Sequence, residues 1–125
     1  MKTILVVDDD PHFRRSLVIG LETMGFKVFE AEGGIEALEF LQKNRKSASQ
    51  ISYAVVDARM PGLDGFWLTD QMTLLYPSIR VVILSAHSYP VPLGRYSVLT
   101  KPVRIANLVN VLNGKVRCIK EGSVS

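Results

Sequence analysis

Five polar side chains stand directly after apolar runs of this 125-residue chain, namely Asp8, Asp9, Asp57, Ser85 and Lys101. Neighbouring carboxylates repel one another and lose hydration near a protein interior, so something must compensate the charge of the acids. Acidic sites that offer only oxygen ligands hold hard divalent cations, and we expect Mg²⁺ here, with some of its waters retained.

The same residue types suit phosphoryl transfer. A bound cation offsets the repulsion among the acids and leaves a site that receives an oxyanion. Lys101 adds positive charge from the opposite side, and the hydroxyl of Ser85 is able to hydrogen-bond a phosphoryl oxygen. Catalysis of this reaction rests mainly on positioning and charge neutralisation, and a carboxylate is an accepted phosphoryl nucleophile. The set therefore predicts metal-supported phosphate chemistry.

Short apolar runs separated by helical patterns must position these residues. The runs are continuous rather than alternating, which is typical of parallel strands covered on both faces. They are Ile4–Val7, Val28–Ala31, Ala54–Val56, Val81–Leu84 and Val98–Thr100. Because strand and helix alternate, we predict a doubly wound α/β fold. Ligands of such sheets bind beyond the carboxyl ends of the strands, where all five polar residues are expected to converge.

Local signals predict where the helices begin and end. Asp10 is expected to cap a first helix that starts with Pro11 and stops at Gly25. Asp64 is expected to cap the helix that follows the third strand. The polar stretch Lys46–Ser52 is interpreted as a surface loop.

The composition is that of an ordinary globular protein, with 47% hydrophobic and 22% charged residues. Its length suits one domain with a hydrophobic core. No apolar run approaches the roughly 20 residues needed to cross a bilayer, so we expect no membrane contact. The aspartates arrive too early for a signal peptide, and the single Cys118 cannot form an internal disulfide. A cytoplasmic location is the simplest assignment.

The net charge of +3 is unevenly distributed. Basic residues collect toward the C-terminus, at Lys101, Arg104, Lys115, Arg117 and Lys120. No aromatic residues alternate with these cations, so we interpret them as a solvated helix face and do not predict direct nucleic-acid binding.

Four motifs in order resemble the receiver domain of two-component response regulators. They are V-V-D-D-D at 6–10, D-A-R-M-P-G-L-D-G at 57–65, L-S-A at 84–86 and K-P at 101–102. The resemblance covers nearly the whole chain and implies a flavodoxin-like, five-stranded parallel sheet of strand order 2-1-3-4-5. Residues 1–121 are expected to form the receiver domain, and 122–125 a tail or the start of a linker.

The resemblance implies a role for each site residue. Asp57 matches the position that accepts a phosphoryl group from a sensor histidine kinase or phosphotransfer protein. Asp9 is expected to bind Mg²⁺ directly and Asp8 chiefly through water, with Asp57 and the backbone carbonyl of Arg59 completing the protein ligands.

The resemblance also covers the residues that surround the phosphoryl group. Ser85 matches the hydroxyl that moves onto that group, and Lys101 matches the lysine that pairs with its oxygens. Pro102 matches a proline preceded by a cis peptide bond. Arg59 and His87 match positions that border the path of attacking water, although His87 also fits an ordinary exposed loop histidine.

The sequence departs from the family between the fourth and fifth strands. Two prolines and a glycine, Pro90, Pro92 and Gly94, break any helical pattern there. We therefore predict that the family's fourth helix is missing or replaced by a proline-containing loop. The family's aromatic switch position is occupied by Val98, and Tyr96 or Tyr89 would substitute only from a different register.

Downstream, the resemblance implies a partner protein or a fused effector domain, and the chain is either a stand-alone receiver or the front of a longer regulator. A final helix is predicted from Ile105 to Ile119. If the fourth helix is missing, Leu108, Leu112 and Ile119 are expected to be partly uncovered, which would permit a homodimer.

Three functions are compatible with these residues. The first is a phosphorylation-activated switch that is not a conventional enzyme but phosphorylates itself from a donor and dephosphorylates itself. The second is a receiver-fold interaction module that works without phosphate. The third is a metal-dependent phosphohydrolase. Such an enzyme needs an acid for the leaving group two residues after the nucleophile, and Arg59 occupies that position, which argues against this function.

Overall fold

A computed structural model describes residues 2–87 and 96–114 of the chain. Five parallel strands form one sheet in the order β2-β1-β3-β4-β5. The strands are β1 (Thr3–Val7), β2 (Lys27–Ala31), β3 (Ile51–Asp57), β4 (Arg80–Ser85) and β5 (Val98–Thr100). The helices are α1 (Pro11–Thr23), α2 (Gly34–Lys43), α3 (Arg45–Gln50), α4 (Gly65–Leu75) and α5 (Ile105–Leu112). The predicted fold and strand order are confirmed.

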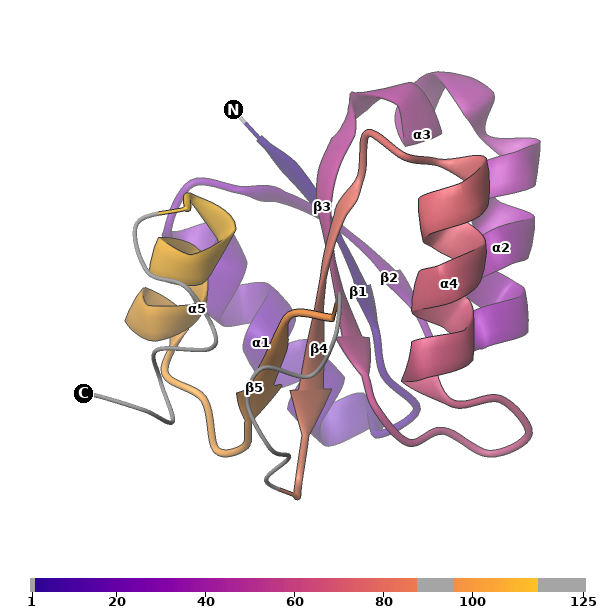
Figure 1. Cartoon of the computed structure of the whole chain (residues 1–125). Helices are drawn as coiled ribbons and strands as arrows, with labels where there is room; N and C mark the ends of the chain where they lie inside the picture. The colour runs from indigo at the N-terminus through magenta and orange to yellow at the C-terminus, as the bar shows by residue number, and fades with distance from the viewer. Residues whose placement is uncertain (1, 88–95, 115–125) are drawn as a thin grey trace.

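Helices cover both faces of the sheet, as Figure 1 shows: α1 and α5 lie on one face, and α2, α3 and α4 on the other. Every residue of β1 is buried because this strand faces a hydrophobic core on each side. Ile4 and Val6 pack with Leu17, Leu108 and other residues on the α1–α5 side. Leu5 and Val7 pack against the α2–α4 side. The continuous apolar runs of the sequence follow from this double burial.

The helix caps lie where the sequence predicts them. The Asp10 side chain accepts hydrogen bonds from the backbone N–H groups of His12 and Phe13. Asp64 accepts one from the N–H of Trp67 and thereby caps α4. Gly25, with φ +96°, follows α1 in a conformation that residues with a side chain rarely adopt.

One predicted loop is wrong. Residues 45–50 form the short helix α3, and β3 already begins at Ile51. Polar composition suggested a loop, but Ala48 is buried and packs into the core beneath α2. A single apolar anchor therefore fixes a helix whose other side chains are polar, and its helical period is too short to recognise in the sequence.

The expected exposure of the last helix is also wrong where the structure describes it. Leu108 is 0% and Leu112 1% exposed, because α5 packs against α1 and the sheet. The apolar surface invoked for a homodimer is therefore not provided by these two leucines. Ile119 and the rest of the predicted helix beyond Gly114 lie outside the described residues.

The connection between β4 and β5 was predicted to lack the family's helix. Residues 88–95 of this connection, with the prolines and the glycine, lie outside the described part of the chain. Residues 86–87 and 96–97, on either side, are not helical. Among the described helices, none is long and apolar enough to span a bilayer.

We predict that Gly65→Ala destabilises the protein by roughly 1–3 kcal/mol. A Cβ atom at Gly65 overlaps the backbone carbonyl oxygen of Asp57, and backbone cannot move aside as a flexible side chain does. The matched control is Gly34→Ala, whose Cβ lies at ordinary contact distance from the side chains of Leu63, at 3.4 Å, and Leu68, at 3.9 Å. Urea unfolding measures both variants, and equal stability of the two would contradict this account.

Candidate functional site

The acidic residues converge at the carboxyl edge of the sheet. Because β1 and β3 pair with Val7 opposite Val56, Asp8 and Asp57 leave neighbouring strands side by side. Asp8, Asp9 and Asp57 each offer a carboxylate oxygen, and these three oxygens lie within 4.8 Å of one another. Asp8 is buried, Asp57 is half-buried and Asp9 is exposed. The cluster therefore opens to solvent on the Asp9 side.

Lys101 joins this cluster from the other side. Its Nζ lies 3.1 Å from Asp57 Oδ1 and 3.4 Å from Asp8 Oδ2. The pairing of β4 with β5 brings it there, and the Lys101 backbone N–H donates a 2.6 Å hydrogen bond to the Ser85 carbonyl. The Lys101–Pro102 peptide bond is cis. One ammonium group thus bridges two carboxylates.

Two residues of α1 complete this arrangement, and the sequence analysis missed both. The ring of Phe13 lies under Lys101, with Nζ 4.1 Å from the ring centroid, which is cation–π distance. Arg14 donates a 2.6 Å hydrogen bond from Nη1 to the Asp8 carbonyl and a 3.1 Å bond from Nε to Glu30. In the sequence, the only indication that Phe13 and Arg14 belong to the site is their position in the first helical turn after Asp10.

Asp8 is held in place from several directions. Its Oδ1 accepts a 2.9 Å hydrogen bond from the Asp10 N–H, and its own N–H donates to the Ala31 carbonyl. The residue is only 2% exposed. Burial raises the pKa of the Asp8 carboxyl above its usual value, and the charge of Asp57 adds to the rise. The Asp10 N–H and Lys101 oppose it without cancelling it.

The remaining predicted residues line the same edge. Ser85 is buried at the end of β4, and its Oγ accepts a 3.0 Å hydrogen bond from the His87 N–H. The hydroxyl hydrogen of Ser85 therefore stays available to donate. Arg59 and His87 are both exposed. The structure thus brings the acids, the hydroxyl and the amine to one edge of the sheet.

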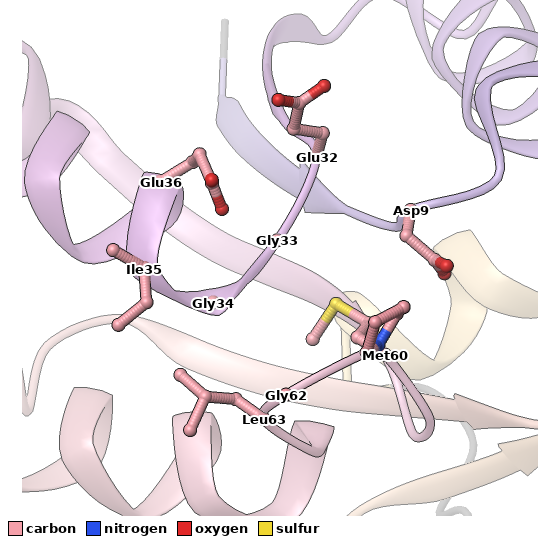
Figure 2. A pocket seen from close by; sticks show the side chains of 10 residues that line it. Asp9, Glu32, Gly33, Gly34, Ile35, Glu36, Met60, Gly62 and Leu63 are labelled. Atoms are coloured by element: carbon pink, nitrogen blue, oxygen red, sulfur yellow. The ribbon is translucent and has the colours of Figure 1, made fainter.

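A cleft of about 580 Å³ opens beside the acids. Figure 2 shows Asp9 across this opening from Ile35 and Glu36, with Met60 and Leu63 on the third side. The acidic cluster is therefore accessible from this side.

Tyr96 lies just before β5 and reaches across to α4. Its hydroxyl hydrogen-bonds the Asp70 carboxylate at 2.9 and 3.1 Å, and its ring packs edge-on against Phe66. Val98 is half-buried within β5, and Tyr89 lies outside the described residues. Within the described part of the β4–β5 connection, Tyr96 is therefore an aromatic residue that contacts α4, two positions before Val98.

Comparison with known families decides the assignment. The family model described as response regulator receiver domain matches residues 4–113. This chain belongs to that family. The predicted resemblance is confirmed over most of the receiver domain's length.

The curated relatives of this receiver domain are longer proteins. The transcriptional regulatory protein GlrR of Escherichia coli is 35% identical over 106 residues, covering 80% of this chain and 23% of the relative. The sensor histidine kinase RcsC of Salmonella typhi is 34% identical over 115 residues, covering 87% and 12%. The chain thus spans less than a quarter of these relatives.

Solved structures agree with the receiver fold. A receiver domain protein from Clostridium thermocellum superposes with a TM-score of 0.79 at 25% identity, over 97% of this chain and 96% of the other. The response regulator TrrA of Thermotoga maritima, solved in complex with Mg²⁺ and BeF, gives 0.76 at 26% identity, over 93% and 100%.

We predict that Asp8→Asn stabilises the metal-free protein at neutral pH. The raised pKa means that ionised Asp8 lowers stability. The loss of folding free energy is complete above the pKa of Asp8 in the folded protein. It disappears as the pH falls toward the pKa of an unperturbed Asp, so the stabilisation by Asp8→Asn also decreases at low pH. Urea unfolding in chelator at several pH values measures both effects.

The control for this experiment is Asp10→Asn, because an amide oxygen keeps the cap of α1. We expect it to change stability by less than about 0.5 kcal/mol. An Asp8→Asn protein that is less stable than the parent at neutral pH contradicts the proposed electrostatic cost.

Proposed function

We propose that this receiver domain is a phosphorylation-activated switch in which Asp57 accepts the phosphoryl group. The observation that carries the proposal is the position of Lys101, whose ammonium lies 3.1 Å from Asp57 within a cluster of three carboxylates. Such an arrangement neutralises charge around the Asp57 carboxylate, which is not fully buried. Positioning and charge neutralisation are the main requirements of phosphoryl transfer.

The donor set fits Mg²⁺. Three carboxylates whose oxygens lie within 4.8 Å of one another supply the hard ligands that this ion prefers. In the proposal Asp9 and Asp57 bind it directly, Asp8 acts chiefly through water, and the backbone carbonyl of Arg59 is a further ligand. When bound, the ion supplies positive charge to the acids and to the phosphoryl oxygens.

The chain's own residues then have separate tasks. A carboxylate oxygen of Asp57 forms the new bond to phosphorus as the P–N bond of a phosphohistidine breaks, and the imidazole leaves with that electron pair. Lys101 holds the other side of the site and pairs with the developing charge. Ser85, whose oxygen already accepts from His87, donates its hydroxyl hydrogen to a phosphoryl oxygen.

The donor in this proposal is a sensor histidine kinase or a phosphotransfer protein. The matched relatives include a transcriptional regulatory protein and a sensor histidine kinase, each several times longer than this chain. We propose that phosphorylation alters a surface read by a downstream protein or a fused effector domain, in the cytoplasm. Tyr96 is a candidate element of that surface because it ties the start of β5 to α4.

We predict that the protein gains the mass of one phosphoryl group when incubated with Mg²⁺ and acetyl phosphate. Asp57→Asn and chelator should each abolish the adduct, because one removes the nucleophile and the other the charge-neutralising ion. Asp64→Asn is the matched control, since it keeps the α4 cap outside the cluster and should leave the adduct unchanged. Intact-mass spectrometry measures all four cases.

Label that persists in Asp57→Asn overturns the assignment of the acceptor. If no adduct forms with any donor while partners still bind, the phosphate-independent interaction module is the better description.

Exposed residues beside the acceptor are expected to set the lifetime of the phosphoryl group. Arg59 is exposed two residues after Asp57, where its charge shields the group from water. We predict that Arg59→Ala shortens the half-life several-fold, whereas Arg59→Lys preserves most of it. His87→Ala tests the second modulating position in the same decay assay. Decay rates identical to the parent for all three variants contradict this role.

A further inference from the structure

A second concave surface lies at the opposite edge of the sheet, away from the acids. It is a groove of about 380 Å³ between the α2–α3 junction and the turn that joins α4 to β4. Figure 1 shows α3 and this turn together above the amino ends of β3 and β4. The lining comprises Leu41, Gln42, Arg45, Ala48, Ser49, Leu75, Tyr76, Pro77, Ser78 and Ile79.

The groove has a buried apolar floor and an exposed apolar rim. Leu41, Ala48 and Ile79 belong to the hydrophobic core and form the floor. Leu75, which lines the groove, is 57% exposed, and its neighbour Leu74 is 76% exposed. Leu75 thus extends the apolar floor into solvent, and exposed apolar surface of this kind marks sites that bind another molecule.

The charged residue in the lining of the groove is basic. Arg45 lines it, and Lys43 and Lys46 are exposed on either side of Arg45 in the chain. None of these three cations forms an ion pair with a carboxylate of the described residues, whereas Arg14 and Arg15 both pair with Glu30. Residues 40–56 and 71–87, which contain the whole lining, include no Asp or Glu.

We propose that this groove docks a segment of a partner protein in which apolar side chains are flanked by acidic residues. The apolar side chains fill the groove beside Leu75, and the carboxylates of the segment meet Arg45 and the two lysines. A flat anionic lipid surface fits less well, because the apolar floor is recessed. An apolar groove is the kind of surface that takes the apolar face of an amphipathic peptide helix.

This surface is independent of the proposed phosphorylation. The acids gather beyond the carboxyl ends of the strands, and the groove lies at their amino ends. A failure of Asp57 to accept phosphate therefore leaves this inference intact, and the reverse also holds.

The test uses a fluorescent synthetic peptide that carries leucine and phenylalanine side chains among glutamates. We expect saturable binding by anisotropy, with the largest amide shift changes in ¹⁵N spectra at Leu41, Ala48, Tyr76 and Ile79. The double variant Arg45→Glu and Lys46→Glu should weaken binding by roughly tenfold or more, and added salt should weaken binding to the parent. Ser49→Trp, which fills the groove from an exposed position, should weaken it without changing the charge.

Two controls make the result specific. Arg104→Glu reverses one cation at the start of α5, on the other face of the sheet, and should leave the affinity for the peptide within about twofold of the parent. A peptide with lysine in place of glutamate should not bind. Shift changes spread over the whole surface, or equal affinity of the double variant, overturn the proposal. Groove-dependent binding of anionic phospholipid vesicles without peptide binding also overturns it, in favour of a lipid surface.

Discussion

The ammonium of Lys101 between the carboxylates of Asp8 and Asp57 is the interaction on which this site depends. Three acids close together at the edge of a hydrophobic core would repel one another, and Asp8 already shows the cost of burial in its raised pKa. Lys101 offsets part of that charge at 3.1 and 3.4 Å, and Phe13 supports the ammonium from below. The arrangement remains acidic overall, which is why it suits a divalent cation.

The strand order of the sheet brings the polar side chains of the site together. Asp8 and Asp57 leave adjacent strands, and Ser85 and Lys101 leave the next two, so sheet order alone places these four polar side chains side by side. Gly65 lets α4 start against the Asp57 carbonyl, and Asp10 starts α1 directly behind the acids. At the amino ends of the strands, the α2–α3 junction and the end of α4 form an apolar groove with basic Arg45 in its lining, so the two ends of the sheet have opposite chemistry.

Much of this arrangement is predictable from the amino-acid sequence. Strands buried on both faces give unbroken apolar runs, and the residues that follow them mark the site directly, so the pattern alone locates Asp8, Asp57, Ser85 and Lys101. The support from Phe13 and Arg14 is not predictable in this way, because an aromatic or a cation on a helix gives no sign of the distant group that it contacts. Helix α3 was missed because Ala48 alone anchors it, and Leu108 was wrongly expected at the surface because the packing of α5 on α1 is a tertiary property.

The most direct test of this account is a structure of the protein with Mg²⁺ and beryllofluoride. We predict a metal ion among Asp8, Asp9 and Asp57, the beryllofluoride group on a carboxylate oxygen of Asp57, and contacts to that group from Lys101 Nζ and Ser85 Oγ. A beryllofluoride group bound at another residue, or an ion that avoids the three acids while Lys101 keeps its pairing with Asp57, would contradict the central claim.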